Sequence, residues 1–352
     1  AMSGVVNAVT KEGGNQYHGA ASLSYANFLT PHDNIFPGIN DGGLGLNLSQ
    51  DYKFQLEGPI FRDKLSFFVN YRYQDTNGHL NGIRRFNPID YSDYTSENSQ
   101  DWHIENTGDN EYVSMSWSHK TSLLSKIAFK PFDNFKVTGL YTLNDSEGQG
   151  YSHGSKYKPD GRAVGYNTSY MFALNINHML SSSFFYEAKV NYVNNKSQSY
   201  LYEDPLDSRY LHPRYSGTGH SGFSTGGNAG AGRGISTYED INVKVDMTWQ
   251  ATKNHALKGG IHYIDHHINK DAINVRNKYS GLPIENISVQ DSTGKIWWPF
   301  YELEIVPHTD KTMGIYQVNP YEFSGYLQDK LEYEDMVINI GLRYDYFNSD
   351  QR

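Results

Sequence analysis

The sequence has 352 residues, no cysteine and a formal net charge of −9. The absence of cysteine excludes disulfide scaffolds, cysteine-ligated zinc and iron–sulfur clusters, and the acidic balance disfavours binding to a nucleic-acid backbone. Only 38 % of the residues are hydrophobic and no run of roughly 18 apolar residues exists, so no transmembrane helix is predicted. The chain is nevertheless rich in Tyr (29) and Gly (33), which is typical of a transmembrane β-barrel, where aromatic residues line both membrane interfaces.

The first residues of the chain lack the features of a signal peptide, because residues 1–6 contain no basic segment followed by an apolar run. Gly13, Gly14 and Asn15 then precede the first strand-like segment. Glycine tolerates unusual backbone angles, so this short segment is predicted to be a joint. Both ends of the chain look cut, and we interpret the sequence as a fragment of a longer precursor.

Period-two alternation dominates the rest of the chain and predicts β-strands. The clearest case is residues 240–250, where Ile241, Val243, Val245, Met247 and Trp249 share one face and polar residues share the other. In a barrel, the apolar face would meet lipid and the polar face a wet lumen. About eleven strands are predicted, at residues 16–28, 52–60, 65–74, 122–130, 135–144, 169–180, 186–192, 240–250, 255–268, 321–333 and 338–346.

The connections between these strands alternate between short and long. Short turns are predicted at residues 61–64, 131–134, 181–183, 251–254 and 334–335, and long loops at 29–50, 77–118, 146–167, 200–236 and 269–320. Outer-membrane barrels have short periplasmic turns and long extracellular loops, whereas a soluble β-sandwich has no reason to place every long loop at one end. The fold class predicted is therefore all-β: an antiparallel transmembrane β-barrel wall of about eleven strands.

Several sequence blocks then resemble one family in order. Residues 3–15 (SGVVNAVTKEGGN) resemble the last strand of the plug domain of TonB-dependent outer-membrane receptors and the hinge that follows it. Residues 17–19 look like the start of the first barrel strand, and 58–68 (GPIFRDKLSFF) resemble a hairpin common in the Oar-like branch. Residues 326–330 (YLQDK) and 341–346 (GLRYDY) resemble a mid-barrel hairpin of the same family.

This resemblance implies a plugged barrel of about 22 strands. Residues 1–15 would be the end of the plug and the hinge, and residues 16–352 the first half of the barrel. It also implies a bacterial outer-membrane protein that imports a scarce, bulky nutrient such as a siderophore, glycan or peptide. The energy would come from TonB, contacted through an N-terminal part that this sequence lacks. The other implied partners are outer-membrane lipid and, as an option, a surface lipoprotein; no cofactor is implied.

Candidate ligand-binding residues lie in the longest loop. Trp297, Trp298, Phe300 and Tyr301 form an aromatic cluster there, and exposed aromatic side chains stack on sugars or siderophores. The alternative is that they pack within the loop or lie at the lipid interface. Charged residues on the lumen side are expected to form a cross-strand ladder that clamps the plug. They are Lys53, Glu57, Arg72, Lys136, Glu187, Lys189, Lys244, Asp246, Lys258, Arg343 and Asp345.

No catalytic motif is present, so no enzyme activity is predicted. His262, His266 and His267 with Asp265 form the densest histidine cluster, but His262 and His266 would lie roughly 13 Å apart on one strand face, too far to share a metal. No metal site is therefore predicted. Two other functions remain open beside energised import: a passive porin, which would have no plug, and a surface barrel for adhesion or secretion, which would bind partners without accumulating a solute.

Overall fold

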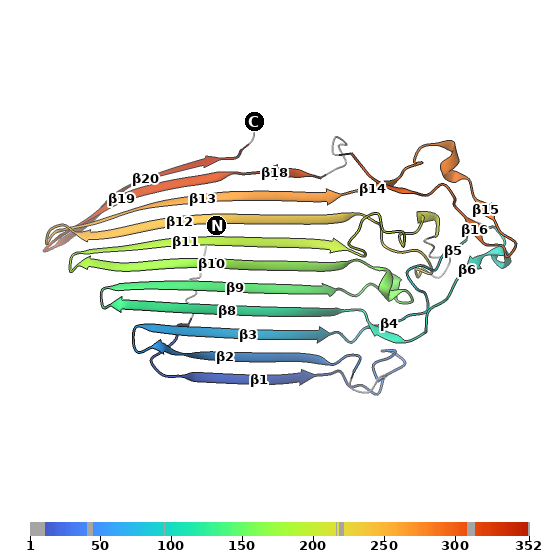
Figure 1. Cartoon of the computed structure of the whole chain (residues 1–352), viewed down its shortest axis with the longest axis horizontal. Coiled ribbons are helices and arrows are strands. Elements are labelled where there is room, and N and C mark those ends of the chain that lie inside the picture. Colours follow the sequence, from blue (N-terminus) through green and yellow to red (C-terminus); the bar gives the residue numbers. More distant parts are fainter. Residues whose placement is uncertain are drawn as a thin grey trace.

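The computed structural model describes residues 11–40, 45–94, 96–215, 217, 222–307 and 314–350. Within these residues, eleven long strands pair antiparallel in sequence order to form one sheet, and the short strand β18 (Tyr316–Val318) pairs with the end of β13 (Figure 1). The long strands are β1 (His18–Ala26), β2 (Ser49–Phe61), β3 (Leu65–Asn77), β8 (Trp117–Phe132), β9 (Phe135–Gln149), β10 (Val164–Ser181), β11 (Phe184–Tyr200), β12 (Arg233–Gln250), β13 (His255–Ile273), β19 (Tyr321–Tyr333) and β20 (Met336–Asn348). The predicted plug strand, at residues 3–10, lies outside the described residues.

The all-β antiparallel fold predicted from the alternation is confirmed, because each of the eleven predicted segments overlaps one long strand. The five short turns also lie where they were expected, between successive strands at one end of the sheet (Figure 1). The strands from β10 to β13 are longer than expected, at 18, 17, 18 and 19 residues. They continue past the apolar stretch into polar segments, which the alternation of apolar residues could not reveal.

Apolar side chains cover one face of the sheet, which we call the outer face. The register places Val190, Val243 and Tyr263 side by side on β11, β12 and β13. These side chains have no second layer over them: Ile261 is 54 % exposed and Leu342 is 79 % exposed. Large exposed apolar patches of this kind mark an interaction surface, and a continuous one around a sheet wall fits contact with lipid.

Two rows of aromatic residues border this apolar band. The row nearer the loops includes Tyr25, Tyr52, Tyr73, Tyr141, Phe172, Tyr192, Tyr263, Tyr321 and Tyr346, and the row nearer the turns includes Phe129, Phe135, His178, Tyr186 and Trp249. The apolar run on β12 from Ile241 to Trp249 spans roughly 26 Å of strand, or about 20 Å along the membrane normal after a tilt of about 40°. The band is therefore close to the height of a membrane core.

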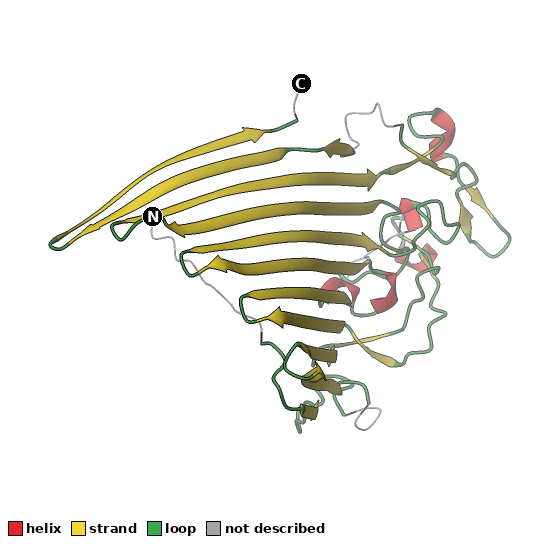
Figure 2. Cartoon of the chain, turned by 60° about the vertical axis from the view of Figure 1, so that its left-hand side comes forward, coloured by secondary structure: helices red, strands yellow, loops and turns green. Residues whose placement is uncertain are grey.

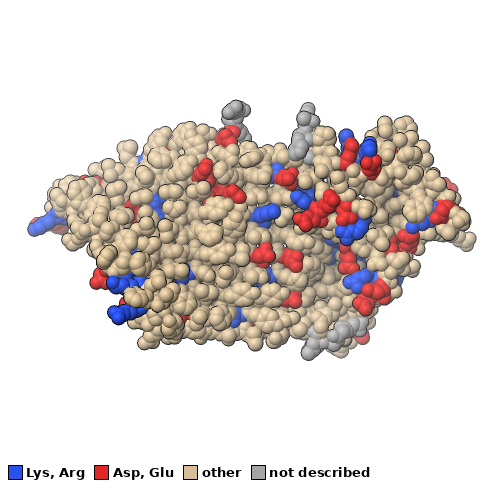
Figure 3. All heavy atoms as spheres, in the orientation of Figure 1, with Lys and Arg blue, Asp and Glu red and all other residues tan. Residues whose placement is uncertain are grey.

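The other face, the inner face, is polar and more crowded. Lys126 is 7 % exposed, Thr138 is 7 % exposed and Ser324 is 9 % exposed, as expected where side chains converge on the concave side of a curved sheet. Figure 2 shows this curvature, since the strands near β1 are seen end-on while those near β20 run across the view. Figure 3 shows the opposite, outer face, where charged side chains gather towards the loop end and are sparse over much of the sheet nearer the turns.

The expected ladder of opposite charges across strands is found between β2 and β3, where Arg72 pairs with Asp51 at 2.7 Å, but it is wrong between β11 and β12. The register places Glu187 opposite Asp246 and Lys189 opposite Lys244, so charges of the same sign face each other. Each is neutralised along its own strand, at 3.0 Å between Lys189 Nζ and Glu187 Oε2 and at 2.9 Å between Lys244 Nζ and Asp246 Oδ2. Residues two apart on a strand share a face, so the wall stays paired by a different arrangement.

The loops contain the shorter elements. These are β4 (Asn81–Ile83), β5 (Ser92–Asp93), η1 (Ser99–Asp101), β6 (His103–Ile104), β7 (Tyr112–Ser114), η2 (His153–Ser155), η3 (Pro159–Gly161), η4 (Pro213–Tyr215), β14 (Val275–Asn277), η6 (Pro283–Asn286), β15 (Val289–Gln290), β16 (Ile296–Trp297) and β17 (Leu303–Ile305). None of the helical segments that the structure describes is long and apolar enough to cross a membrane.

Candidate functional site

The five long loops meet at one end of the sheet, and we call them L1 (27–48), L2 (78–116), L3 (150–163), L4 (201–232) and L5 (274–320) (Figure 1). Most of the fully buried apolar residues lie here rather than in the sheet, with Met115 at 0 %, Tyr91 at 2 % and Tyr210 at 3 % exposure. The loops therefore form a packed layer with its own core, not a set of independent connections.

Hydrogen bonds join loops that are distant in the sequence. Asn47 of L1 donates to Asn81 of L2 at 2.9 Å. The backbone N–H of Ile83 in L2 donates to the carbonyl of Lys156 in L3 at 2.8 Å. L2 and L5 are joined by an ion pair of 2.6 Å between Lys295 Nζ and Glu105 Oε1. These contacts order the loop layer without a ligand, so a binding surface in it is preformed.

A cavity of about 710 Å³ lies between L4 and L5. This volume is in the range of small-molecule binding sites. Its lining mixes guanidinium, carboxylate, amide, hydroxyl and aromatic groups with apolar and backbone surface. The lining residues with side-chain polar atoms are Tyr210, His212, Arg214, Asn228, Arg276, Asn277, Ser280, Glu285, Asn286 and Tyr301. The cavity is the strongest candidate for a ligand site among the described residues.

The four aromatic residues predicted to bind ligand do not share one surface, although Trp298 and Tyr301 both pack on His212. Tyr301 lines the cavity, and its hydroxyl donates to the carbonyl of Leu211 at 3.1 Å. Trp298 lies behind the cavity wall, stacked on His212 with ring centroids 5.0 Å apart and planes 7° apart. Phe300 packs edge-on against Tyr279.

Trp297 differs from the other three aromatic residues. It is 47 % exposed, the Lys295 ammonium lies 4.4 Å from its ring centroid, and its indole N–H donates to Asp291 at 3.3 Å. Both alternatives considered from the sequence therefore occur. Tyr301 lines the cavity, while Trp298 and Phe300 pack within the loop layer. Ligand contact by these residues stays a prediction.

Of the two arginines that line the cavity, Arg214 has the weaker contacts. Its guanidinium lies 3.4 Å from Asn286 Oδ1 and 5.5 Å from the centroid of the Trp298 ring, and it has no ion pair with a carboxylate in the part of the chain that the structure describes. Arg276, by contrast, is paired with Glu304 at 2.8 Å. Arg214 was not singled out from the sequence, because a single arginine in a loop carries no pattern.

Burial fixes the protonation of two neighbouring groups. It lowers the pKa of His212, and the nearby charge of Arg214 lowers it further, so the imidazole is neutral near pH 7. Burial also raises the pKa of Tyr301 to about 12, which keeps its hydroxyl protonated. The cavity therefore offers the guanidinium of Arg214 without an acidic partner among the described residues, the carboxylate of Glu285, amides, and neutral hydrogen-bonding groups. Such a set suits a polar ligand that carries hydroxyl or carbonyl oxygens with some negative charge.

Lys158 holds L3 against L4 from a buried position. It is 4 % exposed, and its ammonium donates to the carbonyl of Gly226 at 2.7 Å. Burial lowers its pKa to about 8. Burying a charge in this way is costly when no opposite charge compensates it.

We expect Lys158→Met to stabilise the loop layer at pH 7 by about 1–3 kcal/mol. The substitution removes the free-energy penalty of burying the ammonium charge, and this gain is reduced by about 1 kcal/mol because the hydrogen bond to Gly226 is lost. Between about pH 8 and the ordinary lysine pKa of about 10.4, the unfolded chain binds more protons than the folded one, so the wild-type layer should gain stability as pH rises. The measurement is the hydrogen-exchange rate of the backbone amides of residues 222–231, expressed at each pH as the ratio of the variant's rate to the wild-type rate. A ratio that does not change with pH would contradict the argument.

The three residues predicted as a joint lie at the turn end of the sheet. Glu12 bonds the lysines at 126 and 136 on the inner face, with 3.0 Å between Glu12 and Lys126 Nζ, and Lys11 Nζ lies 2.7 Å from Glu57. A Cβ built on Gly13 would lie 2.1 Å from the carbonyl oxygen of Phe67, whereas one on Gly14 would meet nothing nearer than 4.0 Å. Gly14 and Asn15 are exposed. The role of this segment as a hinge stays a prediction.

The histidine cluster is divided among separate partners. His262 pairs with Asn242 at 3.0 Å, His266 with Asp240 at 2.6 Å and His267 with Asn319 at 2.7 Å. No group of three or more His, Asp or Glu side chains that could hold a metal ion occurs among the residues described above.

Comparison with known proteins identifies the fold through structure alone. No protein-family profile and no curated protein matches the sequence. The structure is similar to the outer membrane transporter YddB from Escherichia coli, with a TM-score of 0.57 and 16 % identity over 95 % of this chain and 39 % of that one. It is also similar to the ferripyoverdine receptor of the Pseudomonas aeruginosa outer membrane, with a TM-score of 0.53 and 9 % identity over 97 % of this chain and 40 % of that one.

A variant of the ferric enterobactin receptor PfeA from the same bacterium gives a TM-score of 0.51 and 12 % identity, over 96 % of this chain and 40 % of the receptor. The chain thus spans about 40 % of the length of these proteins. Its sheet matches part of the barrels of these outer-membrane receptors and transporters. The Oar-like branch and the plug strand stay predictions.

Proposed function

We propose that this chain is part of a TonB-dependent receptor that imports a scarce, bulky nutrient across the bacterial outer membrane. The observation that carries the proposal is the continuous outer apolar face bordered by two aromatic rows, opposite a polar, ion-paired inner face. This combination suits a barrel wall with lipid on one side and water on the other. The similarity to outer-membrane transporters supports it.

The cavity between L4 and L5 would be the first binding site of the nutrient. Its place at the loop end corresponds to the cell exterior in a barrel of this kind. Arg214, Asn228 and Tyr301 would bind the oxygen atoms of the nutrient. The segment around Gly13 would connect the wall to a plug, and TonB would act on that plug.

Depletion of solutes from the growth medium tests this function. Cells that produce the full-length protein should remove at least one compound too large for passive diffusion, and a protonophore should abolish the removal. We expect Arg214→Ala to slow removal by roughly tenfold, the loss of about 1.5 kcal/mol expected for one hydrogen bond to a charged group. Arg209→Ala is the matched control, since Arg209 is paired with Asp207 at 2.6 Å outside the cavity lining.

The other outcomes separate the alternatives. Removal that persists with the protonophore would indicate a passive porin. Binding of cells or proteins without removal of any solute would indicate a surface adhesion barrel. Either result would overturn the proposal.

A further inference from the structure

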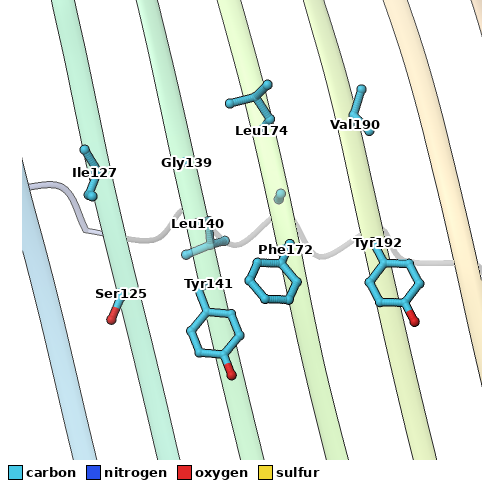
Figure 4. A pocket seen from close by; sticks show the side chains of 10 residues that line it. Ser125, Ile127, Gly139, Leu140, Tyr141, Phe172, Leu174, Val190 and Tyr192 are labelled. Carbon is cyan, nitrogen blue, oxygen red and sulfur yellow. The ribbon is translucent and has the colours of Figure 1, made fainter.

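The outer face of the sheet contains a hollow centred on Gly139 of β9 (Figure 4). Its volume is about 400 Å³, and Gly139 lies in register between Ile127 on β8 and Leu174 on β10. A Cβ built on Gly139 meets no atom within 4 Å. The missing side chain therefore leaves a gap in an otherwise continuous apolar surface.

Apolar side chains surround this gap. Phe172 is 52 % exposed, Leu174 is 46 % exposed and Val190 is 44 % exposed, while the Tyr141 and Phe172 rings lie 4.7 Å apart along one rim. A gap of this kind costs packing energy if it stays empty, because the atoms that line it lack contacts on one side. A flexible hydrocarbon chain fits it better than a rigid or polar molecule.

The geometry also gives the hollow a direction. The phenol oxygens of Tyr141 and Tyr192 both point to the same end of the strands, which is the loop end because residue numbers on β9 increase that way (Figure 4). Tyrosines at a membrane interface direct their hydroxyls to the headgroups. The hollow therefore lies in the leaflet nearer the loops, with its headgroup side towards them.

A cation lies above the hollow on the same face. Val190, Tyr192, Asn194 and Lys196 alternate outward on β11, and Lys196 is about 20 Å of strand from Val190. Lys196 is exposed, and the described residues include no ion pair to it. On the same face, Glu239 accepts a hydrogen bond from Asn194 at 2.6 Å and Asp145 accepts one from Thr168 at 2.6 Å, and neither is ion-paired with Lys196 among the described residues.

We propose that the Gly139 hollow holds one acyl chain of a lipid A-type glycolipid whose phosphate lies at Lys196. The proposal rests on the proposed function, because it requires the outer face to lie in an outer membrane with the loops outside. The exterior leaflet of such a membrane consists of phosphorylated glycolipid. We therefore assign the site to lipid A and not to a glycerophospholipid. An acyl chain that moves from the surrounding lipid into the hollow gains only better packing, because both environments are apolar. The contact between Lys196 and the headgroup phosphate therefore supplies the selectivity.

Native mass spectrometry of the full-length protein tests this with lipid A as the probe and phosphatidylglycerol as the competitor. Wild type should retain one lipid A through mild detergent exchange. Gly139→Leu fills the hollow and should lower the retained fraction by about tenfold, and Lys196→Gln should lower retention of lipid A by a similar factor, as for one lost charge-assisted contact. Gly234→Leu is the matched control, because a Cβ at Gly234 also meets open space and Gly234 lies outside the hollow.

Equal retention by wild type and Gly139→Leu would overturn the acyl-chain site, and equal retention of phosphatidylglycerol would overturn the assignment to lipid A. Should Gly139→Leu fail to reach the membrane, Lys196→Gln tests the headgroup contact with the hollow intact, and retention of lipid A equal to wild type would overturn the proposal. Failure of the membrane location on which this proposal rests has a different signature, because wild type itself would then not fractionate with outer membranes.

Discussion

Val245→Arg should prevent stable insertion of the sheet into a membrane, whereas Asn191→Arg should leave insertion close to wild type. Val245 lies at the middle of the apolar run of β12, between Ala188 on β11 and Ile261 on β13. An arginine facing lipid at the midplane of a barrel costs about 2–4 kcal/mol. Asn191 is on the inner face opposite Asn242, where an added guanidinium would meet water and polar groups.

The measurement is the urea midpoint of the full-length protein folded into liposomes, together with the fraction recovered from outer membranes. Val245→Arg should lower both, and Asn191→Arg neither. Equal effects of the two substitutions would mean that the outer face is not in lipid. The membrane assignment would then fail, and the apolar surface would instead have to pack against another protein layer.

The parts of this fold that the sequence predicts are those set by local chemistry. Side chains alternate across a strand, so a wall with lipid on one side and water on the other leaves a period of two in the sequence. The run from Ile241 to Trp249 shows this directly, and the short turns follow from the gaps between such runs. Each strand could therefore be located without knowing its neighbours.

The pairing of charges on the inner face could not be predicted in the same way. Which residue faces Glu187 depends on the register, and the register is set by the geometry of the turn at 182–183 and by the next loop. A shift of one strand by two residues would place Lys244 opposite Glu187, with no change in the apolar alternation. Between β11 and β12, the ion pairs within each strand are compatible with the observed register, whereas pairs of opposite charges directly across the strands are not.

The loop layer was beyond prediction for a different reason. The Tyr91 hydroxyl accepts a hydrogen bond from the backbone of Ile296 at 3.1 Å, and the two residues are 205 positions apart. Lys295 and Glu105 are 190 positions apart. No periodicity connects such residues. The aromatic cluster marked Trp298 and Tyr301 as candidate ligand-binding residues, but nothing in the sequence indicated that His212 and Arg214 lie beside them.

Gly13→Ala should detach the segment that precedes β1 from the inner face, and Gly14→Ala should not. The alanine Cβ at position 13 would lie 2.1 Å from the backbone oxygen of Phe67, and the backbone of Phe67 is held in the sheet between Gly58 of β2 and Ile127 of β8. The segment would have to shift, taking Glu12 and Lys11 with it. Glu57 is 4 % exposed and Lys11 is its ion-pair partner, so the shift should cost about 1–3 kcal/mol, allowing for the solvent exposure of Lys11.

The rate of trypsin cleavage after Lys11 reports this detachment, since a segment held against the wall is a poor substrate. Neither Gly13 nor Gly14 has a positive φ, so conformational freedom is not what the folded state requires of them. If the pair acts as a flexible joint, both alanine variants should slow nutrient uptake to a similar extent without faster cleavage. If Gly13 instead permits close contact with the wall, only Gly13→Ala should speed cleavage and change uptake. We expect the second result, and similar behaviour of the two variants in both measurements would refute it.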